Sequence, residues 1–361
     1  MLSIRKLALG IGVTIGVGAA ANSFIGSLHT IKAHASTVPA NGDVNPYGVA
    51  VVPINSGLLE QRHVLVSNFN NSANLQGTGT TIVQVSPGDN TVKLFAQISA
   101  KNLPGPCPGG VGLTTALVAL KSGFVIVGSL PTTNGMAATA QAGCLIVLNS
   151  AGKVVETIAE PDINGPWDMT ALDLGNSAVL FVTNVLNKTV AANGGTVTDG
   201  TVLRIVLGIP YGGKPYEISH TVIASGFGQK TDPAALVIGP TGVGLGHDGI
   251  LYVADTLGNR ITAISNAVTR TTNAGTGTTI SGGGGLNAPL GLVIAPNGNI
   301  VTVNSNDGNM VETTPSGTQV AVKPVDVTNI GAGTLFGLAI SPNFEGIYFV
   351  NDGNNTLDLL H

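Results

Sequence analysis

Short apolar stretches recur along the chain and are separated by turns rich in Gly, Pro, Asn and Asp. Many of these stretches are dominated by Val, Ile and Leu, as in HVLVSN, FVIVGS and VLFVTN. Short runs of this composition, bounded by turn residues, indicate β-strands rather than helices. The pattern therefore predicts an all-β chain with many short strands.

The strands form a phrase that occurs six times. Each copy opens with an apolar strand after a turn, continues with a second strand that ends in a small polar residue, and adds up to two more strands. The opening strands are expected at Asn45–Pro53, Gly112–Leu120, Gly165–Leu174, Asp232–Pro240, Ala288–Pro296 and Leu335–Pro342. Four-stranded units that repeat every ~45–65 residues are typical of a β-propeller. A two-sheet sandwich is the alternative, and six copies of one phrase argue against it.

The prediction is thus a single six-bladed β-propeller over residues 36–361, with about four antiparallel strands per blade. The expected blades span residues 45–98, 109–160, 165–226, 231–281, 286–325 and 333–361. The sixth copy lacks a fourth strand. We expect the N-terminal segment 36–44 to supply it, because an open ring would leave an exposed strand edge.

Residues 1–35 have the pattern of a signal peptide. Arg5 and Lys6 precede the apolar run Leu7–Ala21, and Ala33–Ala35 is a small-x-small motif. This arrangement predicts cleavage after Ala35 and a secreted or periplasmic protein. The alternative is that the segment is retained as an anchor, which would be the protein's one contact with a membrane.

The charge balance narrows the range of partners. Removal of Arg5, Lys6 and Lys32 would leave 12 of the 15 basic residues against 19 acidic ones, a net charge of −7. No basic patch is present, which argues against a nucleic-acid partner. The two cysteines, Cys107 and Cys144, predict one disulfide in an exported protein, and two buried thiols are the alternative.

The stretch LYVADTLGNRI, Leu251 to Ile261, resembles the NHL repeat, in which a strand ending Val-Ala-Asp is followed by a short loop and Asn-Arg-Ile. The openings Pro46-Tyr47-Gly48 and Pro289-Leu290-Gly291 are similar to that repeat as well. The resemblance covers residues 45–361 in outline, although the other five copies lack the Arg. It implies a six-bladed propeller with a binding or scaffold role. Related propellers that are enzymes include gluconolactonase-type lactonases, peptidylglycine lyases and strictosidine synthases.

Propeller topology predicts that two rings of residues share one face of the disc, the face on which each first strand begins, here called the top face. The second strands are expected to end in Asn68, Ser129, Asn184, Asp255, Ser305 and Asp352. An apolar ring near the central opening is expected from Tyr47, Leu113, Trp167, Ala234, Leu290 and Phe336. In one interpretation the polar residues terminate strands and the apolar ones pack the core.

In the other interpretation the rings form a ligand pocket at the mouth of the channel. Its binding residues would be Tyr47, Trp167, Phe336, Asn68 and Asn184. The loops between second and third strands are long in the first three blades, and variable loops on a rigid scaffold commonly carry binding sites.

Ca²⁺ is the cofactor that this face would suit, because carboxylate and amide oxygens are its usual ligands. The candidate ligands are Asp168, Asn184, Asp255 and Asp352. Lactonase-type propellers use Glu, Asn and Asp around Ca²⁺, and here Asp168 would have to replace the Glu. No G-x-S-x-G or H-E-x-x-H motif is present.

We therefore expect a binding module that takes a small molecule or a protein at its top face. A Ca²⁺-dependent hydrolase of the lactonase type is the first alternative, and a structural envelope or matrix protein is the second.

Overall fold

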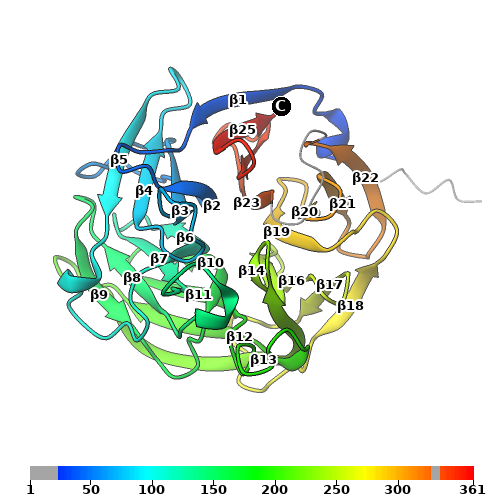
Figure 1. Cartoon of the computed structure of the whole chain (residues 1–361). Helices are drawn as coiled ribbons and strands as arrows, with labels where there is room; N and C mark the ends of the chain where they lie inside the picture. Colours follow the sequence, from blue (N-terminus) through cyan, green and yellow to red (C-terminus); the bar gives the residue numbers. More distant parts are fainter. Residues whose placement is uncertain (1–22, 327–333) are drawn as a thin grey trace, which may run out of the picture.

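A computed structural model of the chain describes residues 23–326 and 334–361. Six antiparallel sheets are arranged around one axis, which confirms the predicted six-bladed β-propeller (Figure 1). Within the described residues the helical turns are three short 3₁₀ helices: η1 (Ile25–Ser27), η2 (Ala100–Asn102) and η3 (Ala137–Thr139). In the same part of the chain, no helix has the length and apolar character needed to cross a membrane.

In the first five blades the strands pair in chain order, and the first four strands of each blade follow one another outward from the axis (Figure 1). Blade 1 contains β2 (Val44–Val51), β3 (Val64–Asn70), β4 (Thr81–Val85) and β5 (Val92–Gln97), and blade 2 contains β6 (Leu113–Ala119), β7 (Val125–Ser129), β8 (Cys144–Leu148) and β9 (Val154–Ile158). Blade 3 contains β10 (Pro166–Asp173), β11 (Ser177–Asn184), β12 (Val197–Gly208), β13 (Tyr216–Asp232) and β14 (Leu236–Ile238). Blade 4 contains β15 (Pro240–Leu245), β16 (Leu251–Asp255), β17 (Arg260–Ile264) and β18 (Thr278–Gly282), and blade 5 contains β19 (Pro289–Ile294), β20 (Ile300–Asn304), β21 (Asn309–Thr313) and β22 (Gln319–Pro324). Blade 6 contains β23 (Leu335–Ile340), β24 (Ile347–Asn351), β25 (Thr356–Leu360) and β1 (Ile31–Ser36).

The second strand of each blade is covered on both faces by neighbouring blades. Every residue of β16, β20 and β24 is buried. Strands covered on both faces can be apolar throughout, whereas half-exposed strands alternate. The outer strand β5 is largely exposed, and β22 is half-buried to exposed with no fully buried residue. This difference explains why the second strands gave the clearest apolar runs in the sequence.

The innermost strands pack backbone against backbone. A Cβ atom at Gly337 would overlap the carbonyl oxygen of Tyr47 in the next blade, and one at Gly291 would overlap that of Phe336. Gly242 meets the backbone of Leu290 in the same way. The glycine of the Pro-x-Gly openings is therefore required because adjacent inner strands leave no space for a side chain.

The ring is closed from the N-terminal side, but by a different segment from the expected 36–44. Strand β1, Ile31–Ser36, pairs with β25 from Ile31 opposite Leu360 to Ser36 opposite Thr356. Figure 1 shows β1 along the rim beside β25. The residues that follow Ser36 include Pro39 and Gly42 and form the turn into β2, so they could not extend the sheet.

The start of blade 4 also differs from the prediction. The expected first strand, Asp232–Pro240, contains β14, which pairs with β13 and belongs to the sheet of blade 3. The first strand of blade 4 is β15, Pro240–Leu245. Residues 235–238 are the more apolar stretch, and this misled the assignment. The apolar pattern of β15 is interrupted by Gly242 and Gly244. A Cβ atom at either position would contact backbone or side chains of blade 5.

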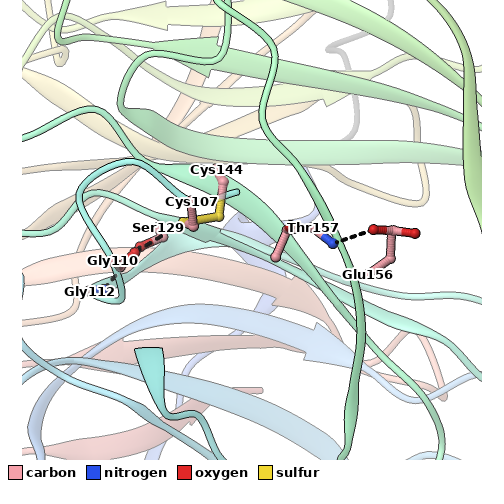
Figure 2. The surroundings of a disulfide bond; sticks show 7 residues. All are labelled: Cys107, Gly110, Gly112, Ser129, Cys144, Glu156 and Thr157. Atoms are coloured by element: carbon pink, nitrogen blue, oxygen red, sulfur yellow. Dashed lines mark hydrogen bonds between the residues drawn. A yellow bond between two sulfur atoms is a disulfide. The ribbon is translucent and has the colours of Figure 1, made fainter. Parts of the chain in front are cut away.

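The predicted disulfide between Cys107 and Cys144 is confirmed (Figure 2). It joins the loop that enters blade 2 to the first residue of β8. Ser129, the ladder partner of Cys144, fixes the same loop: its hydroxyl donates to the carbonyl of Gly110 and accepts from the N–H of Gly112. The entry to blade 2 is thus held covalently and by hydrogen bonds.

Candidate functional site

The top end of the axis is filled by aromatic side chains. The rings of Tyr47 and Phe336 stack with centroids 3.7 Å apart, and those of Tyr47 and Phe69 lie 4.4 Å apart. Trp167 contacts the same group, with 6.0 Å between its ring centroid and that of Phe336. All four side chains are at most 3% exposed. The three residues expected to form a ligand floor are therefore part of the core.

A hairpin covers this aromatic group. Strand β14 and the end of β13 that pairs with it lie near the axis, and Leu236 and Val237 belong to the same buried cluster as Tyr47 (Figure 1). The indole N–H of Trp167 donates to the carbonyl of Val237 over 3.2 Å. The remaining space beside these aromatic rings is about 10 Å³, room for no more than about one water molecule. The aromatic residues therefore leave no pocket at the centre of the top face, but a cavity of about 410 Å³ lies on the same face beside the hairpin, where Asp232, Leu290 and Ser305 are among the lining residues.

The strand pairing corrects the two predicted rings. The residues opposite Pro46 of β2 and opposite the first residue of the other five inner strands are Asn68, Ser129, Asn184, Asp255, Asn304 and Asn351. Ser305 and Asp352 lie one residue beyond this ring. By the same pairing, the apolar ring contains Thr114 and Thr241 in place of Leu113 and Ala234.

The polar ring residues hold the loops that enter the blades. The side-chain oxygen of Asn184 accepts from the N–H of Asn164 over 3.1 Å, and the amide of Asn68 donates to the carbonyl of Thr37 over 3.0 Å. Both asparagines are fully buried. Their hydrogen bonds are made within the protein, so they do not form an exposed binding rim.

Asp255 and Arg260 form an ion pair at the end of β16. The Nε of Arg260 lies 2.7 Å from Oδ2 of Asp255, whose other oxygen accepts from the N–H of Gly258. Arg260 also donates to the hydroxyl of Thr279 on β18. The pair therefore joins three strands of blade 4, and the carboxylate of Asp255 is 3% exposed.

The four residues expected to bind Ca²⁺ do not fit such a site. Within residues 23–326 and 334–361, Asp168, Asp255 and Asp352 belong to no common cluster of three ligand groups within 4.8 Å. Asp255 is paired with Arg260, and Asn184 is bonded to its own loop. The cluster that does occur, Glu160, Glu217 and His220, lies away from the axis near the outer strands of blades 2 and 3.

The accessible cavity on the axis lies below the aromatic group. It has a volume of about 420 Å³ and is lined by the inner strands of all six blades, mainly by Val, Leu, Ile and Ala. It extends toward the face on which first and second strands are joined, opposite the top face, where Asp173 and His247 lie among the lining residues. Its volume is within the range of small-molecule sites.

Two polar groups line the inner end of this cavity. Thr115 and Asp168 occupy, in adjacent blades, the position that is Gly in the other four. Asp168 is 9% exposed, and its carboxylate accepts from the N–H groups of Met169 and Val243 over 2.8 and 3.0 Å. Burial raises the pKa of Asp168 to about 7, because desolvation outweighs these two hydrogen bonds. Thr115 is 4% exposed, and its hydroxyl has no hydrogen-bond partner among the described residues.

Asp168 is among the residues predicted from the sequence, as a Ca²⁺ ligand at the top face. Thr115 is not among them, because the predicted apolar ring uses Leu113 in blade 2, one residue out of register. The signal available for Thr115 was the pair Thr114-Thr115 in an otherwise aliphatic strand.

Comparisons with known proteins show the fold. No family model matches the chain, so the NHL label is not confirmed, and no curated protein matches it. Among solved structures, a luciferin-regenerating enzyme is similar with a TM-score of 0.56 at 11% identity, covering 91% of this chain and 94% of that one. A gluconolactonase from Xanthomonas campestris has a TM-score of 0.52 at 12% identity, covering 90% and 87%. The calcium-binding protein regucalcin from Agrobacterium tumefaciens has a TM-score of 0.52 at 12% identity, covering 90% and 92%.

Proposed function

We propose that the protein is a binding module whose axial cavity takes a small, mainly aliphatic molecule with a positively charged amine. The observation that carries this proposal is the buried carboxylate of Asp168 among the residues lining the apolar cavity. An apolar cavity with a few polar groups is the common design of small-molecule sites. A cation beside a desolvated carboxylate offsets the unfavourable burial of its charge.

Asp168 and Thr115 have complementary roles in this proposal. An ammonium group can donate to the carboxylate of Asp168, and the buried hydroxyl of Thr115 in the adjacent blade is a second acceptor that has no partner among the described residues. The aliphatic body of the ligand packs against the Val, Leu and Ile side chains of the inner strands. The site therefore favours a cation over an anion of the same size.

The test uses three probes of equal chain length: hexylamine, hexanol and hexanoate. We expect calorimetry at pH 8 to show binding of hexylamine in preference to the other two. The preference should disappear in Asp168→Asn, and Thr115→Val should weaken amine binding without abolishing it. Asp173→Asn, at the other end of the cavity lining, is the matched control and should keep the preference. Equal binding of the three probes, or no binding at millimolar concentration, would contradict the proposal.

The lactonase alternative is supported by similarity of fold, at identities that carry no statement about activity. Three of the four expected Ca²⁺ ligands already have partners in the protein: Asp168 accepts from two backbone N–H groups, Asn184 bonds its own loop and Asp255 pairs with Arg260. Elemental analysis together with melting in the presence and absence of EDTA tests this alternative. Bound calcium and a lower melting temperature in EDTA would favour it over the amine-binding module.

A further inference from the structure

The segment that precedes the expected cleavage site is part of the folded propeller. Strand β1, Ile31–Ser36, contains the motif Ala33–Ala35 and pairs with β25. The segment before it is also attached, because Thr30 and His361 exchange two backbone hydrogen bonds of 2.8 and 2.9 Å. Cleavage after Ala35 would remove five of the six residues of β1 and leave the edge of β25 unpaired.

A buried carboxylate fixes the beginning of this segment. Glu312 on β21 is fully buried and accepts from the hydroxyl of Ser23 at 2.6 Å and from the N–H groups of Phe24 and Ile25 at 2.8 Å each. Asn297 and Asn299 donate to it as well. Burial opposes the charge of Glu312, but the hydrogen bonds outweigh it and lower its pKa.

Apolar contacts hold the same segment. Ile25 and Leu28 are 0% and 6% exposed and belong to the core cluster between blades 5 and 6. Further along, the ring of His34 bonds to Asn90 in blade 1 at 2.7 Å. Without residues 23–35, Glu312 would lose three of its donors, and both the core and the contact with blade 1 would be incomplete.

We propose that the leader is cut between Ala21 and Asn22, so that the exported protein begins directly before Ser23. The sequence supplies the required motif there: Ala19-Ala20-Ala21 is a small-x-small site at the end of the apolar run. The partner is a signal peptidase of the exporting cell. Hydrolysis of the Ala21–Asn22 peptide bond consumes one water molecule and leaves a carboxyl group on Ala21 and an amino group on Asn22. Residues 1–22 themselves lie outside the described part of the chain.

The main test is the N-terminus of the exported protein. The full chain, with its own leader, is produced in an exporting bacterium, and the protein outside the cytoplasm is analysed by N-terminal sequencing and intact mass. A terminus at Asn22 is expected. A terminus at Ser36, or a chain that still begins at Met1, would overturn the proposal. Ala33→Lys removes the second motif at an exposed position of β1 and should leave the terminus at Asn22.

Hydrogen exchange tests the anchoring by Glu312 separately. In the exported protein, the amides of Phe24 and Ile25 should be protected, and Glu312→Gln should speed their exchange at least tenfold. Glu345→Gln is the matched control, since Glu345 is exposed and bonds to Asn343 within its own turn. Unchanged exchange in Glu312→Gln would show that this carboxylate does not anchor the segment and would contradict that step of the proposal.

Discussion

The buried carboxylate of Asp168 predicts a measurable pH dependence of stability. Its pKa in the folded protein, about 7, is above the ordinary value of 3.8. The unfolding free energy contributed by this group is therefore highest below pH 3.8 and falls as the pH rises through about 7. At about 1.4 kcal/mol per pH unit, the difference between the two values corresponds to a loss on the order of 4 kcal/mol.

Asp168→Asn removes this titration while preserving the shape of the side chain. The amide cannot accept from both Met169 and Val243, which costs about 1–3 kcal/mol at every pH. We expect the unfolding free energy of the variant relative to wild type to rise by ~3 kcal/mol between pH 4.5 and pH 8.5. Urea denaturation at several pH values measures this difference in unfolding free energy.

Other titrating groups cancel in this comparison, because both proteins contain them. Asp352 and Asp358, with pKa values raised to about 7 and about 6 mainly by burial, contribute equally to wild type and variant. A difference between variant and wild type that is constant from pH 4.5 to pH 8.5 would refute the assignment of a raised pKa to Asp168.

Three further outcomes follow from the packing. Gly337→Ala should lower the unfolding free energy by about 1–3 kcal/mol or more, because the added methyl group overlaps the backbone of the next blade. Gly88→Ala is the control: a methyl group there would meet nothing within 4 Å and should have little effect. Denaturant titration measures both. Replacing Cys107 and Cys144 together by Ser should cost about 4 kcal/mol in the loop-entropy model, and an unchanged melting temperature would contradict it. A chain that begins at Ser36 should melt at least several degrees below one that begins at Asn22, and equal melting temperatures would mean that β1 does not stabilise the ring.

The sequence predicted the propeller because its second strands are covered on both sides and must be apolar. The same feature made Asp255 and Arg260 conspicuous, and the structure places them as an ion pair within one blade. Register was harder to predict. Asn304 and Ser305 are both small and polar, and only the pairing with Pro289 identifies Asn304 as the ring residue.

The candidate site was predicted less well than the fold, since it depends on contacts between blades. The local sequence around Tyr47 or Trp167 does not predict that a hairpin from blade 3 covers these side chains. Likewise, Asp168 is conspicuous in the sequence, but its place at the inner end of the cavity depends on the direction in which all six inner strands run.

The pairing of β1 with β25 has a consequence for how the chain is made. Blades 1 to 5 each consist of strands that follow one another, so each has all its strands soon after synthesis of that part of the chain. Blade 6 joins residues near the two ends, and it cannot form until Leu360 has been synthesised. The propeller therefore remains an open ring until β25 has been synthesised, and a chain that stops between β24 and β25 would leave the edges of β1 and β24 unpaired and open to proteases.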